Sequence, residues 1–341
     1  MGPERNRPRL AVTLGDPAGI GPEVVLAALA DARVREAARL VAIGPAALRP
    51  AEVPTLERGD VAGAPDLAWL ESAGPARWEL GRVQPECGAA ALAALRAGHE
   101  LALAGDVDGL VTAPVSKAAL RAAGEVCEGQ TELLGRWSGV ERFEMVAIAG
   151  TLRVMLLTRH LPLVEALAAV SAERVLDRLR LFDGALRRLG FERPRLALAG
   201  LNPHAGENGL IGREDLERLV PAVAAARAEG LDVSGPHSPD AVFLAAREGR
   251  HDGVLALYHD QAFIPVKLVA GGEGLTWIAG LPYLRVSPAH GTAFDIAGTG
   301  RASPRNLVAA LLQAAAWARG TPLGGPRGAS SPPRAPGRGL H

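Results

Sequence analysis

The sequence predicts an α/β protein built on a mainly parallel β-sheet. Short apolar runs alternate along the chain with longer segments of helical spacing, and that alternation is typical of α/β folds. The chain has 341 residues, of which 48% are hydrophobic. This length and composition provide for two domains, or for one large α/β unit with a sizeable core.

Each expected element follows from its local pattern. The first strand is expected at 9–14, and the turn GDPAGIGPE follows it, with Pro22 and Glu23 suited to a helix start. The remaining strands are expected at 108–112, 152–158, 195–200 and 253–258, and helices at 22–40, after 117, and at about 164–189, 213–229 and 305–318. Residues 319–341 are rich in Gly, Pro and Ser, so we expect this tail to be disordered.

Charge and cysteine content restrict the class of protein. The 37 basic residues balance the 37 acidic ones, which argues against nucleic acid or an anionic membrane as the main partner. No apolar run reaches the roughly 18 residues of a membrane-spanning helix, and the first ten residues are polar. Cys87 and Cys127 lie far apart and form no CxxC pair, so we expect two small buried side chains and a cytoplasmic, reducing location.

Three of the eight histidines share one position in the pattern. His160, His204 and His259 each come just after the carboxyl end of an expected strand, and ligands of α/β sheets bind at that edge. Three neutral imidazoles meeting there would form an open site for a divalent metal. The gaps of 44 and 55 residues do not establish this, and three hydrogen-bonded loop histidines remain the alternative.

Two cations follow His259 in apolar surroundings. Lys267 lies in FIPVKLV and Arg285 ends GLPYLR. Such a pair suits a phosphate or a carboxylate, with solvated surface charges as the alternative. The turn GDPAGIGPE matches neither GxxxxGK[ST] nor GxGxxG, so a plain tight turn explains it equally well, and no standard dinucleotide fingerprint is found.

Seven segments together resemble one family. TLGDPAGIGPE, TAPVSK, GQTELL, TRHLPL, LNPHAGENG, YHDQ and HGTAFDIAGTG occur in order between about residues 9 and 317. In that order and spacing they are similar to the 4-hydroxythreonine-4-phosphate dehydrogenases of vitamin B6 synthesis. The resemblance implies a fold like that of isocitrate and isopropylmalate dehydrogenases, with two α/β/α lobes, a cleft between them and an obligate homodimer. Residues 1–127 plus 291–318 would form the first lobe and 128–290 the second.

The resemblance also implies roles for individual residues. It implies one divalent ion, Zn, Mg or Co, held by His160, His204 and His259 from two subunits. The matching substrate positions are Gln130, Thr131, Lys267, Thr276 and Arg285, and those for NAD(P) are His290, Gly291, Thr292, Ala293 and Asp295. Asp240 is a candidate general base, with a water chain as the alternative, while Asp16 and Lys117 lie in matching motifs without an assigned role.

The implied reaction is an oxidation followed by a decarboxylation. NAD(P) takes hydride from 4-phosphohydroxy-L-threonine, the metal stabilises the alkoxide, and loss of CO₂ gives 3-amino-2-oxopropyl phosphate for pyridoxal phosphate biosynthesis. Gln130, Thr276 and Ala289 stand where the family usually has His, Asn and Asp. These departures leave open a related substrate, erythronate or threonate 4-phosphate, although Arg285 favours a phosphorylated one. Two other classes are also considered, a three-His metal hydrolase that needs no NAD loop and a non-catalytic phospho-ligand sensor.

Overall fold

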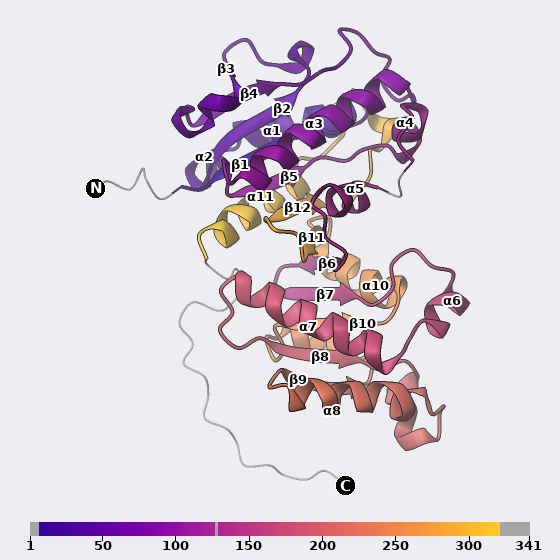
Figure 1. Cartoon of the computed structure of the whole chain (residues 1–341). Coiled ribbons are helices and arrows are strands. Elements are labelled where there is room, and N and C mark those ends of the chain that lie inside the picture. Colours follow the sequence, from indigo (N-terminus) through magenta and orange to yellow (C-terminus); the bar gives the residue numbers. More distant parts are fainter. Residues whose placement is uncertain (1–6, 127–128, 321–341) are drawn as a thin grey trace.

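A single β-sheet runs through the whole molecule. The computed structural model describes residues 7–126 and 129–320 (Figure 1), and its 12 strands follow the order β3-β4-β2-β1-β5-β12-β11-β6-β7-β10-β8-β9. The strands are β1 Arg9–Thr13, β2 Arg39–Gly44, β3 Thr55–Leu56, β4 Leu67–Glu71, β5 Gly109–Thr112, β6 Glu144–Ala149, β7 Leu152–Leu156, β8 Arg195–Ala199, β9 Asp232–His237, β10 Gly253–Ala256, β11 Leu275–Ala279 and β12 Arg285–Pro288.

Helices cover the two halves of this sheet. They are α1 Gly21–Ala30, α2 Ala32–Ala37, α3 Pro85–Ala104, α4 Lys117–Ala122, α5 Gln130–Trp137, α6 Leu163–Ala168, α7 Ala172–Arg188, α8 Val220–Ala228, α9 Val242–Arg247, α10 His259–Ala270 and α11 Arg305–Ala318. In Figure 1, α1 to α4 and α11 surround the strands from β1 to β5, while α6, α7, α8 and α10 surround the other half. The predicted α/β class with two layered halves is confirmed.

The sheet is parallel at both ends and antiparallel in the middle. All pairings from β3 to β12 and from β7 to β9 are parallel, whereas β12–β11, β11–β6 and β6–β7 are antiparallel. The parallel strands β1 and β5 are buried throughout, as expected for strands covered on both faces. Because the sheet is continuous, the lobe boundaries at 127/128 and 290/291 stay a prediction.

Capping residues divide two of the predicted helices. The Asp31 side chain accepts a hydrogen bond from the Arg33 N–H and starts α2, and strand β2 begins at Arg39, so one helix over 22–40 is wrong. Ser171 likewise caps α7 and separates it from α6, dividing the helix predicted at 164–189. Polar caps satisfy free N–H groups at a helix start and so favour a new helix there.

Other sequence predictions concern single segments. The segment predicted as a helix at 213–229 is a π-helical turn, Asp215–Leu219, followed by α8. Cys87 is buried and forms no disulfide within the described residues. Cys127 and residues 321–341 of the predicted tail lie outside the described residues. Among those described, no helix is both long and apolar enough to cross a membrane.

Candidate active site

A cavity of about 410 Å³ lies where the two halves of the sheet meet. Its walls come from β5, β11, β12, α5 and α10, together with the segment after β7. Nine of the predicted site residues line it: Gln130, Thr131, His160, His259, Lys267, Thr276, Arg285, His290 and Gly291. Lys117, which had no assigned role, also lines the cavity. The structure therefore gathers residues from five separate motifs in one place.

Arg285 is the buried cation of this cavity. It opens β12, is 3% exposed, and donates from Nη2 to Thr112 Oγ1 at 2.6 Å. Its Nε is buried and has no hydrogen-bond partner in the described part of the chain, and burial lowers the pKa of the guanidinium to about 10. Within 7–126 and 129–320 no carboxylate forms an ion pair with it. A buried cation without a counter-ion suits an anionic ligand, because an unpaired charge in the interior is costly.

Two lysines add positive charge at the exposed edge of the same cavity. Lys117 opens α4 and Lys267 lies on α10, and both are exposed. The Lys267 ammonium lies 5.7 Å from the centre of the Phe263 ring, within the range of a cation–π contact. Together with Arg285 these residues make the cavity attractive to an anion that carries more than one negative charge.

Two of the three predicted metal ligands face each other. His160 follows strand β7 and His259 follows strand β10, and these two strands are parallel neighbours in the sheet. The ring centres of the two histidines lie 5.6 Å apart. The His259 Nδ1 lies 2.7 Å from Asp260 Oδ1, an arrangement that leaves Nε2 for a metal. Burial lowers the pKa of His160, and the charge of Lys117 lowers it further, so the neutral, ligating form is favoured.

The HGTAFDIAGTG loop packs on the glycine-rich turn that follows β1. Ile20 N–H donates to the Thr292 carbonyl at 3.0 Å, and Gly298 N–H donates to Glu23 Oε1 at 3.2 Å. A Cβ on Gly19 would lie 2.9 Å from the Thr292 oxygen, so glycine permits this close approach. The turn GDPAGIGPE thus supports the HGTAFDIAGTG loop, which extends from the cavity.

Comparison with known proteins identifies the family. The family described as pyridoxal phosphate biosynthetic protein PdxA matches residues 23–314. The chain belongs to the PdxA family.

Individual PdxA-family relatives are similar over nearly their whole length. The 4-hydroxythreonine-4-phosphate dehydrogenase of Geobacter metallireducens is 40% identical, over 94% of this chain and 98% of the relative. The D-threonate 4-phosphate dehydrogenase of Salmonella typhimurium is 42% identical, over 89% and 96%. The solved structure of 4-hydroxythreonine-4-phosphate dehydrogenase from Klebsiella pneumoniae is 38% identical, with a TM-score of 0.83 over 91% of this chain and 99% of that one.

Some predicted site residues lie away from the cavity. These are His204, Asp240, Thr292, Ala293 and Asp295. His204 is exposed in the turn Pro203–Gly209, and among the described residues no group of three His, Cys, Asp or Glu side chains is placed to hold a metal. One chain of this PdxA-family protein therefore brings together two of the three predicted ligands.

Asp240 borders a second cavity, of about 560 Å³, against α9 and α10. It is exposed, and the hydrogen bond from Ser238 Oγ lowers the pKa of its carboxyl group. A lowered pKa makes a weaker base. Its role as the general base stays a prediction.

The structure adds residues that sequence reasoning missed. Glu132, Thr112 and Ser287 line the first cavity, and the one signal in the sequence was that Glu132 follows Thr131 in GQTE. Gln130 was predicted to bind the substrate, but its Nε2 already donates a hydrogen bond to the Ala113 carbonyl at 3.0 Å. Its buried Oε1 has no hydrogen-bond partner among the described residues, so this amide also presents an acceptor.

Proposed function

We propose that the chain is an NAD(P)- and divalent-metal-dependent dehydrogenase that oxidises 4-phosphohydroxy-L-threonine and decarboxylates the product. The end product is 3-amino-2-oxopropyl phosphate, a precursor in pyridoxal phosphate biosynthesis. The observation that carries the proposal is Arg285, a buried guanidinium that forms no ion pair with any described carboxylate, in a cavity that two lysines also line. PdxA-family membership and relatives named as dehydrogenases support the oxidative chemistry.

Different residues of the cavity bind the substrate phosphate, the other substrate oxygens and NAD(P). Arg285 and Lys267 bind the substrate phosphate through charge-assisted hydrogen bonds. Thr131 and Thr276 supply hydroxyl groups for substrate oxygens. His290 and Gly291 begin the loop that holds NAD(P) beside the cavity. When bound, the nicotinamide accepts hydride and a divalent ion polarises the oxygen on the reacting carbon.

The metal site is proposed to need two copies of the chain. His160 and His259 supply two imidazoles from one chain, and His204 of a second copy completes the set. Exposed apolar side chains near these segments favour burial in a homodimer. They include Leu163, Val164, Leu244 and Leu268, which are 56%, 79%, 55% and 79% exposed. Zn, Mg and Co all remain candidates for the ion.

A second substrate has specific support. The D-threonate 4-phosphate dehydrogenase of Salmonella typhimurium is as similar to this chain as the relatives named for 4-hydroxythreonine 4-phosphate. Gln130 and Thr276, which depart from the usual family residues, both line the cavity. D-threonate and D-erythronate 4-phosphate are therefore the competing substrates, and the same phosphate contacts would serve them.

Formation of NADH from each compound tests the proposal. The purified chain is assayed with 4-phosphohydroxy-L-threonine, D-threonate 4-phosphate and D-erythronate 4-phosphate, with and without a chelator. We expect chelator-sensitive NADH formation, fastest with 4-phosphohydroxy-L-threonine. A hundredfold preference for either sugar-acid phosphate would reassign the substrate, and no NADH from any compound would reject the dehydrogenase.

A further inference from the structure

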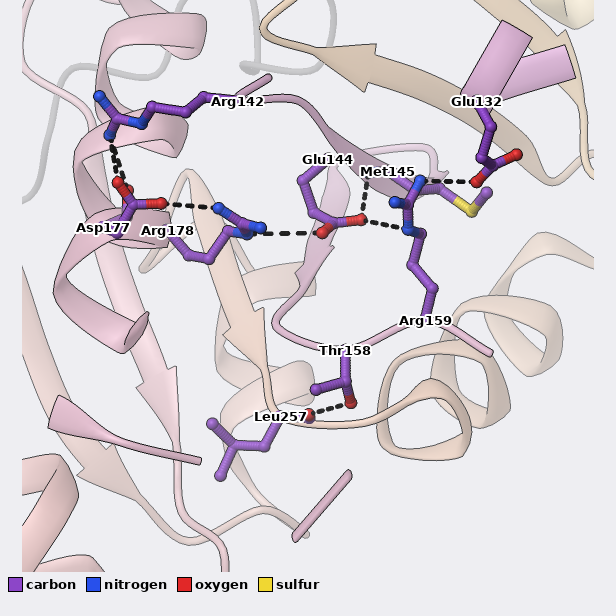
Figure 2. Close-up of polar contacts among 9 residues, drawn as sticks. All are labelled: Glu132, Arg142, Glu144, Met145, Thr158, Arg159, Asp177, Arg178 and Leu257. Carbon is purple, nitrogen blue, oxygen red and sulfur yellow. Dashed lines mark hydrogen bonds and ion pairs between the residues drawn. The ribbon is translucent and has the colours of Figure 1, made fainter. Parts of the chain in front are cut away.

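Several charged side chains in the second half of the sheet satisfy one another. Figure 2 shows one such set, an ion-pair chain that runs from Arg142 to the cavity residue Glu132. Its successive pairs are Arg142–Asp177 at 2.5 Å, Asp177–Arg178 at 2.6 Å, Arg178–Glu144 at 3.4 Å, Glu144–Arg159 at 3.2 Å and Arg159–Glu132 at 2.9 Å. Two histidines of the same half, His237 and His251, differ from this set because they face each other and keep unused ring nitrogens.

His237 and His251 line a third cavity, of about 420 Å³, which shares no residue with the proposed active site. His237 ends β9, and His251 lies in the segment just before β10. Their ring centres are 5.4 Å apart, with the rings tilted by 40°. The predicted metal ligands His160 and His259 have nearly the same arrangement, at 5.6 Å and 40°.

This spacing is the one that a shared metal ion requires. An imidazole nitrogen lies about 2.1 Å from a bound Zn²⁺, and two such rings at a tetrahedral angle have their centres roughly 5.3 Å apart. The observed separation of the His237 and His251 rings, 5.4 Å, agrees with that value. An ion could therefore bind between the two rings without a large rearrangement of either side chain.

The hydrogen bonds of Ser234 determine which nitrogen of His237 is free. Ser234 Oγ donates to the Leu196 carbonyl at 3.3 Å, so this oxygen accepts from His237 Nε2, which is 2.8 Å away. The proton of the neutral ring is then on Nε2, and the lone pair is on Nδ1. Metal-bound histidines are commonly oriented by a hydrogen bond through their other ring nitrogen. Neither nitrogen of His251 has a hydrogen-bond partner among the described residues.

The surroundings of the pair favour neutral imidazoles and allow a cation. Burial lowers the pKa of both rings, which leaves them in the ligating form near neutral pH. Two arginines near His251 are paired with carboxylates, Arg250 with Glu248 at 2.8 Å and Arg195 with Asp252 at 2.9 Å. The positive charge of these arginines is therefore balanced.

We propose that His237 and His251 form a second metal site, which binds a divalent transition-metal ion such as Zn²⁺ through His237 Nδ1 and one nitrogen of His251. Neutral imidazole suits Zn, Ni, Co and Cu, whereas Mg and Ca prefer oxygen ligands. Within 7–126 and 129–320 no group of three His, Cys, Asp or Glu side chains is placed to hold a metal, so water completes the coordination. The ion would join the edge strand β9 to the segment before β10, across the intervening β8, which makes the site structural.

The number of bound zinc ions tests this site. Untagged protein is stripped with a chelator, and Zn²⁺ binding is measured by equilibrium dialysis. We expect about two ions per wild-type chain, one at the proposed active site and one at the new pair. His237→Gln and His251→Gln should each remove one ion, and His251→Gln should leave kcat/KM unchanged. Ser234→Ala should weaken binding of this ion about 10- to 100-fold, because His237 is no longer oriented.

Two further variants separate the new site from the proposed active site. His160→Ala should remove the active-site ion and retain the ion at the new pair. His99→Gln is a matched control, because the His99 ring contacts Trp137 and Tyr283 and lies in neither site, and it should retain both ions. A zinc content that His237→Gln and His251→Gln leave unchanged would overturn the second site and leave the dehydrogenase intact. An equal loss of zinc in His99→Gln would overturn it as well.

Electron paramagnetic resonance examines the ligands themselves. One equivalent of Cu²⁺ is added to metal-free His160→Ala protein, in which the proposed active site is incomplete. The spectrum should show coordination by two imidazole nitrogens, because copper prefers the same ligands. Adding His251→Gln to this variant should abolish that signal. A signal that persists in the double variant would contradict the assignment of His251.

Discussion

Replacing Arg285 by methionine tests the phosphate site at its most buried point. The side chain is 3% exposed and uses Nη2 on Thr112 at 2.6 Å, leaving its other donors for a ligand. One charge-assisted hydrogen bond contributes about 1.5–3 kcal/mol. Its loss corresponds to a decrease of about 10- to 150-fold in kcat/KM, at roughly 1.4 kcal/mol for each factor of ten. Methionine has similar length and carries no charge. The variant removes a buried cation that forms no ion pair with a described residue, and we expect no loss of thermal stability.

The assay compares a phosphorylated substrate with its unphosphorylated counterpart. NADH formation is followed with 4-phosphohydroxy-L-threonine and with 4-hydroxy-L-threonine. Arg188→Met is a matched control, because Arg188 donates to the carbonyls of Leu281 and Pro282 and lies outside the cavity lining. The decrease in kcat/KM caused by Arg285→Met should be large only for the phosphorylated compound. Equal losses with both compounds, or a comparable loss in the control, would refute a phosphate-binding role.

The remaining predictions concern the metal, the dimer and pH. Replacing His160, His204 or His259 by alanine should abolish turnover and release the metal, and full activity in metal-free protein would contradict this. Equal mixing of His160→Ala with His204→Ala protein should restore about a quarter of the sites, because one of the two sites in each mixed dimer has all three histidines. Mixing His160→Ala with His259→Ala should restore none, because each site then lacks one histidine. Identical outcomes despite subunit exchange would contradict the shared site. His99 is buried beside Tyr283, and burial lowers its pKa, so the folded state resists its protonation. Stability should therefore be full above about pH 6.5 and decrease as the pH falls toward the lower folded pKa. His99→Gln should reduce that decrease in thermal denaturation, and an unchanged pH dependence would exclude His99 as its source.

Five of the parallel strands could be predicted because burial on both faces leaves a continuous apolar run, whereas the parallel strands β2, β3, β4 and β9 were not predicted. Strands β1, β5, β7, β8 and β10 lie where such runs predicted them. Strands β6, β11 and β12, which form antiparallel pairs in the middle of the sheet, were also missed. The segments of β11 and β12, LTWIA and RVSP, are short and contain polar residues. The extent of the helices was less predictable, because alanine-rich segments lack strong boundaries, and single capping residues such as Asp31 and Ser171 decide where a new helix starts.

Site residues that belong to a sequence motif could be predicted. Site residues that are brought together only by tertiary packing could not. Arg285 and His160 follow from motif resemblance, and both line the cavity. The ion-pair chain from Arg142 to Glu132 joins segments whose adjacency depends on how β6, β7 and α7 pack. The distance between His204 and the cavity also depends on the turn that follows β8. No local pattern in the sequence contains that information.

Product stoichiometry distinguishes oxidative decarboxylation from hydrolysis of the phosphate ester. NADH, CO₂ and inorganic phosphate are measured in one reaction of the metal-loaded chain with 4-phosphohydroxy-L-threonine and NAD. We expect equal amounts of NADH and CO₂ and no inorganic phosphate, because the proposed role of Arg285 is to bind the phosphate group while the oxidation takes place at the neighbouring carbinol carbon. Release of phosphate without NADH would exclude the dehydrogenase and indicate a metal-dependent hydrolase instead.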